Sequence, residues 1–376
     1  MTAVDLILGM VALVAGAELL VRGAARIAAR FGISPLVIGL TVVAFGTSSP
    51  EMAVSSVAAL NGAADIALGN VVGSNIFNVL VVLGLSALVA PLVVAREVIR
   101  EQTPIMIGVS LLLLLLALDG SISRLEGLLL FAGIIVYTVV LVRRSRTESL
   151  ASRNAEPMLG TGLAEDERAA LETGDRSAVL RPLVTAALGL ALLIAGSDWL
   201  VDAATAIATA IGVSELVIGL TIVAAGTSLP ELATSVVAAL RGERDMAVGN
   251  VVGSNIFNIL AILGVASVIA PGGIAVAPAA LSFDVPVMIA VALVCLPIFF
   301  NGQVIQRWEG LFLLGFYLAY TAYLILDVTG HQAFSEFRAA MVYFVVPLAL
   351  LTLAASSLRH WRRGLAGKHG GGPDDS

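Results

Sequence analysis

Long apolar runs separated by short polar segments make up most of the chain. Each run is about 17–25 residues long, the length that a helix needs to cross a hydrocarbon core of about 30 Å. The predicted helical spans are approximately 4–22, 35–60, 67–90, 103–118, 124–142, 182–201, 215–240, 247–270, 284–300, 308–327 and 340–358. The pattern therefore predicts an all-α polytopic membrane protein with ten core spans and an eleventh near the C-terminus.

One long polar segment, residues 143–181, divides this pattern into two halves. Because it is rich in Arg, Glu, Asp, Ser and Gly, we predict a linker between a first unit, 1–142, and a second unit, 182–327. Residues 328–376 are predicted to hold the extra span and a disordered tail.

The two halves repeat one another. Residues 34–80 and 214–260 align without a gap, and 34 of the 47 positions are identical. Each half contains five predicted spans, an odd number, so the second copy enters the membrane from the opposite side. Transporters are commonly built from such inverted repeats, with the binding site near the membrane midplane between the copies. We therefore expect the site to lie within the motif regions 39–80 and 219–260.

The composition agrees with a membrane location. Of the 376 residues, 59% are hydrophobic and only 13% are charged, whereas soluble domains are about a quarter charged. With the N-terminus outside, 19 of the 21 Lys and Arg residues fall in predicted cytoplasmic segments, as the positive-inside rule expects. Because arginine-rich, lysine-poor usage is typical of many bacterial chains, we predict a bacterial inner membrane, with the linker and the C-terminus cytoplasmic.

Each repeat carries a glutamate inside an apolar span: Glu51 in GTSSPE and Glu231 in GTSLPE. An ionisable side chain at that depth costs at least a few kcal/mol unless it is solvated or paired. No Lys or Arg lies in the interior of a predicted span, since Arg22 and Arg124 stand at span ends. A cation bound between the two carboxylates would relieve both their burial and their mutual repulsion. The structural alternative is a pair of protonated glutamates that tie two helices together.

A proline precedes each glutamate, Pro50 in the first repeat and Pro230 in the second. A proline inside a helix removes one N–H and clashes with the carbonyl four residues earlier, here that of Gly46 or Gly226. Unpaired backbone at membrane depth is tolerated where it is buried in protein or lines a cavity. Carbonyl oxygens freed in this way are hard ligands for Na+ or Ca2+, and we expect them near Ala44, Thr47, Ala224 and Thr227.

Hydroxyl and amide side chains accompany the carboxylates. Thr47 and Glu51 are four residues apart and so share a helix face, with Ser48 beside them. The second string, GNVVGSNIFN, recurs letter for letter and places its serine and final asparagine four residues apart, at Ser74 and Asn78 and at Ser254 and Asn258. Its glycines at 69, 73, 249 and 253 permit close helix packing. An all-oxygen set of this kind suits Ca2+ or Na+ better than metals that prefer thiolate or imidazole.

These two strings and their second copies resemble the repeats of the Ca2+/cation antiporter superfamily, in its Na+/Ca2+ exchanger branch. The resemblance covers both repeats and, by topology, the first ten spans, and it implies alternating access at a central site. It also implies a set of Ca2+ and Na+ ligands: Glu51, Glu231, Thr47, Thr227, Ser48, Ser228, Ser74, Ser254, Asn78, Asn258 and the backbone oxygens of Ala44 and Ala224.

Two features depart from that family. Many relatives carry an aspartate at one of the positions of Asn78 and Asn258, whereas this chain has asparagine at both. The expected site then holds two carboxylates, enough to balance one Ca2+. The span near 340–358 lies beyond the usual ten and has no polar motif, so we interpret it as peripheral.

The sequence therefore predicts a secondary antiporter that exchanges Ca2+ for Na+ and is neither an enzyme nor dependent on a resident cofactor. The expected partners are the two ions and the lipid bilayer. No GxxxxGK[ST] motif predicts nucleotide binding, nothing predicts nucleic-acid binding, and no oligomer is implied. Three alternatives remain open: an antiporter of the same fold that couples H+ to Ca2+, Mg2+ or Mn2+, a membrane protein that binds Ca2+ without transporting it, and an intramembrane enzyme.

Overall fold

The computed structural model describes residues 2–155, 177–211, 224–330 and 334–335 of the chain. Its first half contains helices α1 (Thr2–Phe31), α2 (Pro35–Ile38), α3 (Ala44–Thr47), α4 (Ser49–Leu60), α5 (Ala64–Phe77), α6 (Gly84–Val89), α7 (Thr103–Ala117) and α8 (Arg124–Ala155), π-helical segments η1 (Gly39–Val43), η2 (Asn78–Leu83) and η3 (Val98–Gln102), and strands β1 (Leu92–Val93) and β2 (Ser121–Ile122).

The second half repeats this order of elements. It contains helices α10 (Ser177–Ala210), α12 (Ala224–Gly226), α13 (Leu229–Leu240), α14 (Arg244–Phe257), α15 (Gly264–Ile269), α16 (Val285–Phe300) and α17 (Arg307–Val328), π-helical segments η5 (Asn258–Leu263) and η6 (Ala280–Asp284), and strands β3 (Ile274–Ala275) and β4 (Val304–Ile305).

The prediction of an all-α polytopic membrane protein is confirmed. Among the described residues, eight helices are long and apolar enough to cross a membrane, or up to nine if the bent pair Pro35–Thr47 and Ser49–Leu60 forms one span. The predicted span 340–358 lies outside the described residues, and the predicted span 215–240 is described only from Ala224 onward. The total of ten or eleven spans therefore stays a prediction.

The predicted linker, residues 143–181, begins inside a helix, and its role as a linker between two units stays a prediction. Helix α8 continues without a break to Ala155, and α10 already begins at Ser177. The helix does not end with its apolar run because contacts to other segments continue past it: Arg144 pairs with Glu101 at 2.7 Å, and the Ser145 hydroxyl accepts a hydrogen bond from the Ser34 amide at 3.1 Å. Polar composition thus located the end of the apolar run and not the end of the helix.

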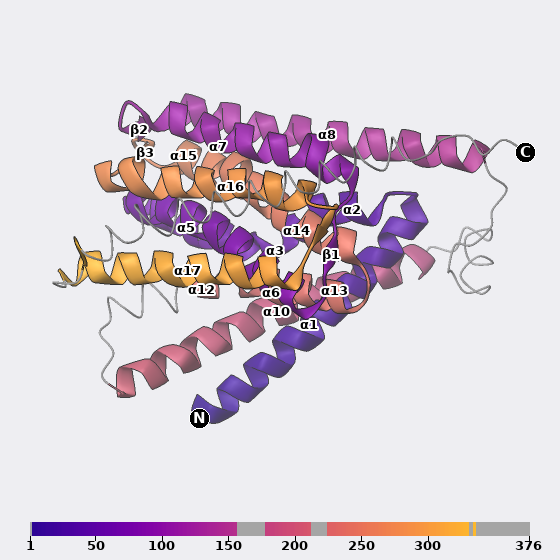
Figure 1. The fold of residues 1–376 in the computed structure, drawn as a ribbon, viewed down its shortest axis with the longest axis horizontal. Coiled ribbons are helices and arrows are strands. Elements are labelled where there is room, and N and C mark those ends of the chain that lie inside the picture. Colours follow the sequence, from indigo (N-terminus) through magenta and orange to yellow (C-terminus); the bar gives the residue numbers. More distant parts are fainter. Residues whose placement is uncertain (1, 156–176, 212–223, 331–333, 336–376) are drawn as a thin grey trace, which may run out of the picture.

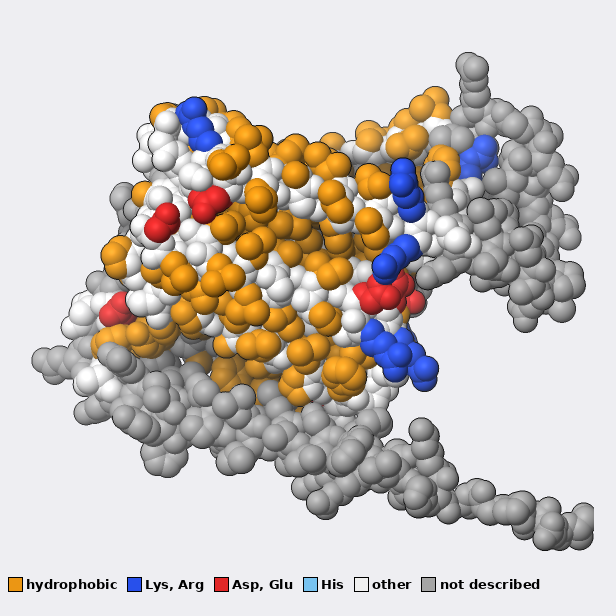
Figure 2. All heavy atoms as spheres, turned by 90° about the horizontal axis from the view of Figure 1, so that it is seen from above, with side chains coloured by type: hydrophobic (Ala, Val, Ile, Leu, Met, Phe, Trp, Pro, Cys, Tyr) orange, Lys and Arg blue, Asp and Glu red, His pale blue; other side chains and the backbone are white. Residues whose placement is uncertain are grey.

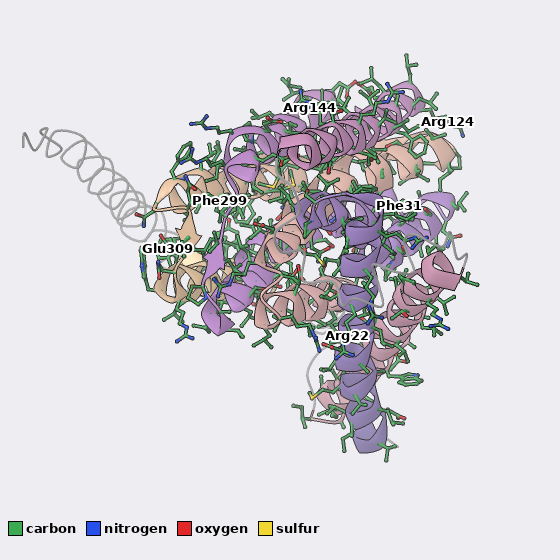
Figure 3. The ribbon with its side chains drawn as sticks, turned by 90° about the vertical axis from the view of Figure 1, so that its right-hand side faces the viewer. Arg22, Phe31, Arg124, Arg144, Phe299 and Glu309 are labelled. Atoms are coloured by element: carbon green, nitrogen blue, oxygen red, sulfur yellow. The ribbon has the colours of Figure 1, made fainter. Side chains whose placement is uncertain are left out.

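Helices α1 and α10 form a long antiparallel pair that crosses the other helices obliquely (Figure 1). Glycines allow their backbones to approach closely. A Cβ atom at Gly9 would lie 3.0 Å from the Gly196 carbonyl oxygen, and one at Gly16 would lie 2.7 Å from the Gly189 carbonyl oxygen. Such small-residue contacts are typical of helix packing in membranes. Part of this pair extends away from the remaining helices (Figure 3).

Two short antiparallel ribbons join the halves. Strand β1 pairs with β4, and β2 pairs with β3, so each ribbon combines one strand from each half. The two ribbons lie at opposite ends of the helix bundle (Figure 1). The helix that follows β2 and the helix that follows β4 are anchored in the same way, since Arg124 and Arg307 each donate a hydrogen bond to a carbonyl of the other half, at 2.9 and 3.4 Å. The contacts of one half are therefore reproduced in the other.

The helices that carry the repeated GNVVGSNIFN string lie at the centre of the molecule. In the most apolar stretches of Ile66–Val89 and Arg244–Ile269, 83% of the positions are buried, against 50% or less in the other candidate spans. Hydrophobic side chains cover the middle of the surface, and charged side chains gather toward its two ends (Figure 2). An apolar belt of this kind is suited to contact with lipid. The polar string is buried inside the protein, so its side chains face protein rather than lipid.

Candidate functional site

Glu51 and Glu231 are fully buried, each in the first turn of a helix that begins at a break. Glu51 lies in α4 and Glu231 in α13, and the two carboxylates are close enough for their charges to interact. Within the described part of the chain, neither forms an ion pair with Lys or Arg. The structure therefore buries two acidic groups together without a basic partner.

The helix breaks occur at Ser48 and Ser228, two residues before each proline. Ser48 has φ −81° and ψ 9°, and Ser228 has φ −91° and ψ 7°, so both lie near the bridge region rather than in the α region. In the first repeat the helices on either side of the break are bent by 46°. The bend follows from the missing proline N–H and from the proline ring, and each glutamate lies in the first turn of the helix that begins after the break.

The backbone oxygens around these breaks are less free than the sequence suggested. The Ala44 carbonyl oxygen accepts a hydrogen bond from the Ser48 amide at 3.0 Å, and the Thr47 hydroxyl lies 3.4 Å from it. In the second repeat the Ser228 amide donates instead to Ala225, at 3.2 Å. The carbonyl that Pro230 leaves unpaired, that of Gly226, accepts from the Ser197 hydroxyl of α10 at 2.6 Å. The role of the Ala44 and Ala224 backbone oxygens as ligands stays a prediction.

Each glutamate accepts a hydrogen bond from the opposite repeat. The Ser48 hydroxyl donates to Glu231 Oε1 at 2.8 Å, and the Ser228 hydroxyl donates to Glu51 Oε1 at 3.0 Å. Both serines are buried. The reciprocal pairing shows that the two GTSxPE strings form one shared site and not two separate ones.

A set of buried oxygen atoms in this region has no hydrogen-bond partner among the described residues. Unpaired buried polar atoms are rare in native proteins, and each requires an explanation. Six of them are symmetry-related pairs from the repeated strings: Oε2 of Glu51 and Glu231, Oγ of Ser74 and Ser254, and Oδ1 of Asn78 and Asn258. The sequence had predicted all six residues as ligands, and the structure leaves one oxygen of each available.

Asn78 and Asn258 stand at the start of equivalent π-helical segments, η2 and η5. Such wide turns interrupt the regular hydrogen-bond ladder and are frequent at functional sites. The Asn78 side-chain amide donates to Asn255 Oδ1 at 3.1 Å, and that of Asn258 donates to Asn75 Oδ1 at 3.0 Å. The side-chain nitrogens of Asn78 and Asn258 therefore donate to the opposite repeat. Their side-chain oxygens have no hydrogen-bond partner among the described residues.

Thr47 and Thr227 are placed differently from the serines. The Thr47 hydroxyl lies 3.1 Å from the Val43 carbonyl oxygen and 3.3 Å from Asn250 Oδ1, and the Thr227 hydroxyl lies 3.4 Å from Asn70 Oδ1. These hydroxyls already have partners in the protein. The structure therefore places both threonines beside the glutamates, but it does not leave their oxygens unpaired.

Sequence reasoning missed the residues that hold the glutamate-bearing helices in place. Asn70 donates to the Glu51 carbonyl oxygen at 3.2 Å and to the Ser55 hydroxyl at 2.9 Å. Asn250 makes the same two contacts in the second repeat, at 3.4 Å to Glu231 and 2.9 Å to Ser235. The available signal was the recurrence of these asparagines in both copies of GNVVGSNIFN, where among the polar letters only the serine and the final asparagine were considered as site residues.

The available oxygens belong to carboxylates, hydroxyls and amides. No group of three or more His, Cys, Asp or Glu residues with metal-binding geometry occurs among the described residues. A set of neutral oxygens around two carboxylates suits a hard cation such as Ca2+ or Na+, whose preferred ligands are oxygen atoms. The same set does not favour the softer transition metals.

Comparisons with known proteins agree with this chemistry. Residues 2–143 and 181–326 match the family model described as sodium/calcium exchanger protein. The chain belongs to the sodium/calcium exchanger family. This membership makes it a multi-pass membrane protein that transports cations, Ca2+ among them, by antiport; its relatives are transporters rather than enzymes.

Individual exchangers and antiporters match over nearly their whole length. The chain is 43% identical over 317 residues to the putative antiporter CaxA of Alkalimonas amylolytica, covering 84% of this chain and 95% of that protein. It is 35% identical to the sodium/calcium exchanger MaX1 of Methanosarcina acetivorans, covering 85% and 97% of the two chains. A solved structure of the sodium-calcium exchanger NCX_Mj, soaked with 10 mM Na+ and zero Ca2+, matches with a TM-score of 0.71 at 31% identity, covering 86% and 98%.

Proposed function

We propose that this exchanger moves Ca2+ against Na+, and that both ions bind in turn to the buried oxygens between the two repeats. The observation that carries the proposal is the set of six unpaired oxygens on Glu51, Glu231, Ser74, Ser254, Asn78 and Asn258. A bound cation would supply the missing partner of each oxygen. The name and the structural match of the relatives support the same choice of ions, because MaX1 and NCX_Mj are called sodium/calcium exchangers.

The charge of the site explains why the two ions compete. Two carboxylates carry two negative charges when ionised, which one Ca2+ neutralises alone and Na+ neutralises only as more than one ion. An empty pair of ionised carboxylates in a low-dielectric interior is costly, so the protein changes state most easily when the site is loaded. Because Ca2+ and Na+ use the same oxygens, loading with one requires release of the other, which gives antiport.

The repeated architecture supports alternating access. We propose that the two halves are inverted in the membrane, that the chain has ten core spans, and that the α1–α10 pair moves over the helices that carry the site. In the present state two polar side chains of this pair contact the region around α12 and α13. Ser197 of α10 donates to the Gly226 carbonyl oxygen, and Glu18 of α1 pairs with both Arg22 and Arg241. Ala17 and Asn61 stand at the positions equivalent to Ser197 and Arg241, so the first repeat lacks both contacts.

Uptake of radiolabelled Ca2+ into proteoliposomes tests the proposed coupling. Vesicles preloaded with Na+ should accumulate Ca2+, while Na+-free vesicles at the same pH should not. Uptake driven by a pH gradient and indifferent to Na+ would instead assign the chain to the H+-coupled alternative. Saturable Ca2+ binding without any uptake would contradict antiport by this chain altogether.

The serines that bridge the repeats should contribute to ion affinity. Ser48→Ala and Ser228→Ala each remove the hydroxyl that donates to the opposite glutamate, so the carboxylate loses the contact that orients it. Loss of a group that orients a ligand typically lowers metal affinity about 10–100-fold. The Ca2+ concentration that gives half-maximal uptake should rise by about that factor.

Ser49→Ala is the matched control for these substitutions. Ser49 is the next residue in the chain, but its hydroxyl is exposed and donates to the Phe45 carbonyl within its own span, at 3.0 Å. We expect the Ser49→Ala variant to reach half-maximal uptake at nearly the same Ca2+ concentration as the unmodified protein. Equal effects of Ser48→Ala and Ser49→Ala would contradict a role for the bridging hydroxyl.

A further inference from the structure

An asparagine side chain can present either of two chemically opposite groups to a cation. Its Oδ1 atom accepts and binds cations, whereas its NH2 group only donates and repels them. The proposed site uses Asn78 and Asn258 through Oδ1, the atoms that lack a partner. The site therefore works only if something holds these two amides in one of their two orientations.

Asn255 has the geometry to hold Asn78. The Asn255 Oδ1 atom accepts from the Asn78 NH2 group at 3.1 Å, which turns Asn78 Oδ1 away from it. Asn255 can do this only while its own NH2 group points elsewhere, and that group lies 3.3 Å from the Asn75 carbonyl oxygen and 3.5 Å from Met106 Sδ. Reversing Asn255 would set two NH2 groups against each other.

The orientation of the Asn255 side chain is determined by the backbone carbonyl group of Asn75. A backbone carbonyl oxygen can only accept a hydrogen bond, so the atom of Asn255 that faces the Asn75 carbonyl must be the nitrogen. The Met106 sulfur is also an acceptor, although a weak one. The backbone of Asn75 thus fixes Asn255, and Asn255 in turn fixes Asn78.

The same chain of contacts runs in the opposite direction through the other repeat. Asn75 donates to the Asn255 carbonyl oxygen at 3.2 Å and to Met288 Sδ at 3.5 Å, and its Oδ1 accepts from Asn258 at 3.0 Å. Asn75 and Asn255 are only 2% and 3% exposed, so water does not compete for these contacts. The amide that each repeat offers to the cation is therefore oriented by the other repeat.

We infer that Asn75 and Asn255 are positioning residues that hold Asn78 and Asn258 with their carbonyl oxygens toward the bound cation. They act through those two ligands and do not touch the ion. The inference rests on the proposed cation site. It adds the groups that decide whether the oxygen or the nitrogen of Asn78 and Asn258 faces the cation. Because each contact crosses between repeats, the ligand set is complete only when the helices α5 and α14 are packed together.

Calorimetric titration of the purified protein with Ca2+ tests this role in a double-mutant cycle. Asn255→Leu removes the contact to Asn78 and keeps the branched shape of the side chain, and Asn78→Ala removes the ligand itself. Each single substitution should weaken Ca2+ binding about 10–100-fold, as loss of a metal ligand's orienting partner typically does. Because Asn255 acts only through Asn78, the double variant should bind about as weakly as Asn78→Ala alone.

Met106→Leu is the control for packing, since it keeps the side-chain volume and removes only the weak sulfur acceptor. Its Ca2+ affinity should stay within about twofold of the unmodified protein, because the Asn75 carbonyl still orients Asn255. If Asn255→Leu does not give a folded protein, Asn255→Ala should weaken Ca2+ binding in the same way. In the other repeat, Asn75→Leu and Asn258→Ala should behave as Asn255→Leu and Asn78→Ala do.

The possible outcomes separate this inference from the proposed function. No Ca2+ binding by the unmodified protein would overturn the proposed site and the inference with it. Normal binding by Asn255→Leu would overturn the positioning role and leave the site intact. Losses that multiply in the double variant would also overturn it, because they would show that Asn255 supports the site independently of Asn78.

Discussion

Glu51→Gln and Glu231→Gln should each abolish Ca2+ transport while the protein remains folded. Glutamine has nearly the same shape, but it removes one of the two negative charges that would balance the ion. It also gives the side chain an NH2 group, which in one of its orientations would replace the unpaired Oε2 oxygen. Leaving a buried charge without its partner costs about 3–5 kcal/mol, which corresponds to a loss of a hundredfold or more in ion binding. Uptake into Na+-loaded proteoliposomes should fall to the level of empty vesicles.

Thermal unfolding gives an independent readout of the same substitutions. A ligand that binds only the folded state raises its stability as the ligand concentration exceeds the dissociation constant. The melting temperature of the unmodified protein should therefore rise with added Ca2+, and those of both glutamine variants should not. Without Ca2+, the variants should be at least as stable as the parent, because two buried carboxylates no longer repel each other.

Glu309→Gln is a matched control in the second half of the chain. Glu309 is also fully buried, but one of its oxygens accepts from the Asn301 side chain at 2.9 Å and the other from the Gln306 amide at 2.8 Å. It caps helix α17 and offers no free oxygen, so its variant should keep Ca2+-dependent stabilisation and transport. Full transport by Glu51→Gln or Glu231→Gln would contradict the assignment of the site.

The helical class and the residues of the candidate site could be predicted because both leave strong local signals. Apolar runs of spanning length are unambiguous in composition, and an uncompensated carboxylate inside such a run is costly enough to mark function. Exact repetition then identified Ser74, Asn78 and their counterparts, all of which carry an unpaired oxygen. Each of these inferences needed only short strings of residues and the comparison of the two copies of a string.

Helix ends and backbone partners could not be predicted in the same way. Helix α8 continues past its apolar run, in a region where a contact to Glu101 lies 43 residues away in the chain. The Gly226 carbonyl freed by Pro230 is taken by Ser197, which no local pattern connects to it. Both depend on which distant segment packs alongside, and a single sequence does not contain that information directly.

The orientation of amides was also inaccessible to the sequence. Counting Asn78 as an oxygen ligand assumes that its carbonyl faces the ion, and only the contact to Asn255 decides this. Equally, Asn70 and Asn250 recur in the repeated string, but their contacts to the glutamate-bearing helices follow from three-dimensional packing. The sequence thus predicted six residues that carry an unpaired oxygen, and the structure shows which groups orient the two amides among them.

Gly253→Ala should disable transport although alanine favours helices. Helix α14 lies so close to η1 and α3 that a Cβ atom at Gly253 would be 2.7 Å from the Leu40 Cα atom and 2.7 Å from the Leu40 carbonyl oxygen. It would also lie 3.0 Å from Ala44 Cβ. Two backbone atoms and a Cβ cannot move aside as a flexible side chain can, so one helix must shift against the other.

A shift of α14 against η1 and α3 would displace residues of the candidate site, because such residues lie on or next to both sides of this contact. Ser254 and Asn258 follow Gly253 on α14 and η5, and Ser48 follows α3. A misplacement of about 1 Å in a catalytic geometry can cost about a hundredfold in rate, and cation coordination is similarly sensitive to ligand distance. We therefore expect Ca2+ uptake at saturating Ca2+ to fall at least about tenfold, with a lower melting temperature.

Gly108→Ala separates this close-contact effect from helix propensity. Gly108 lies in the spanning helix α7, and a Cβ atom there would meet nothing within 4 Å. In the absence of a clash, exchanging glycine for alanine stabilises a helix by about 0.8–1.0 kcal/mol, so Gly108→Ala should melt at a higher temperature and transport normally. The sign of the change in melting temperature therefore separates the two effects. A Gly253→Ala variant that melted at a higher temperature and transported Ca2+ normally would contradict the role of close packing between α14 and α3 in holding the two halves of the site together.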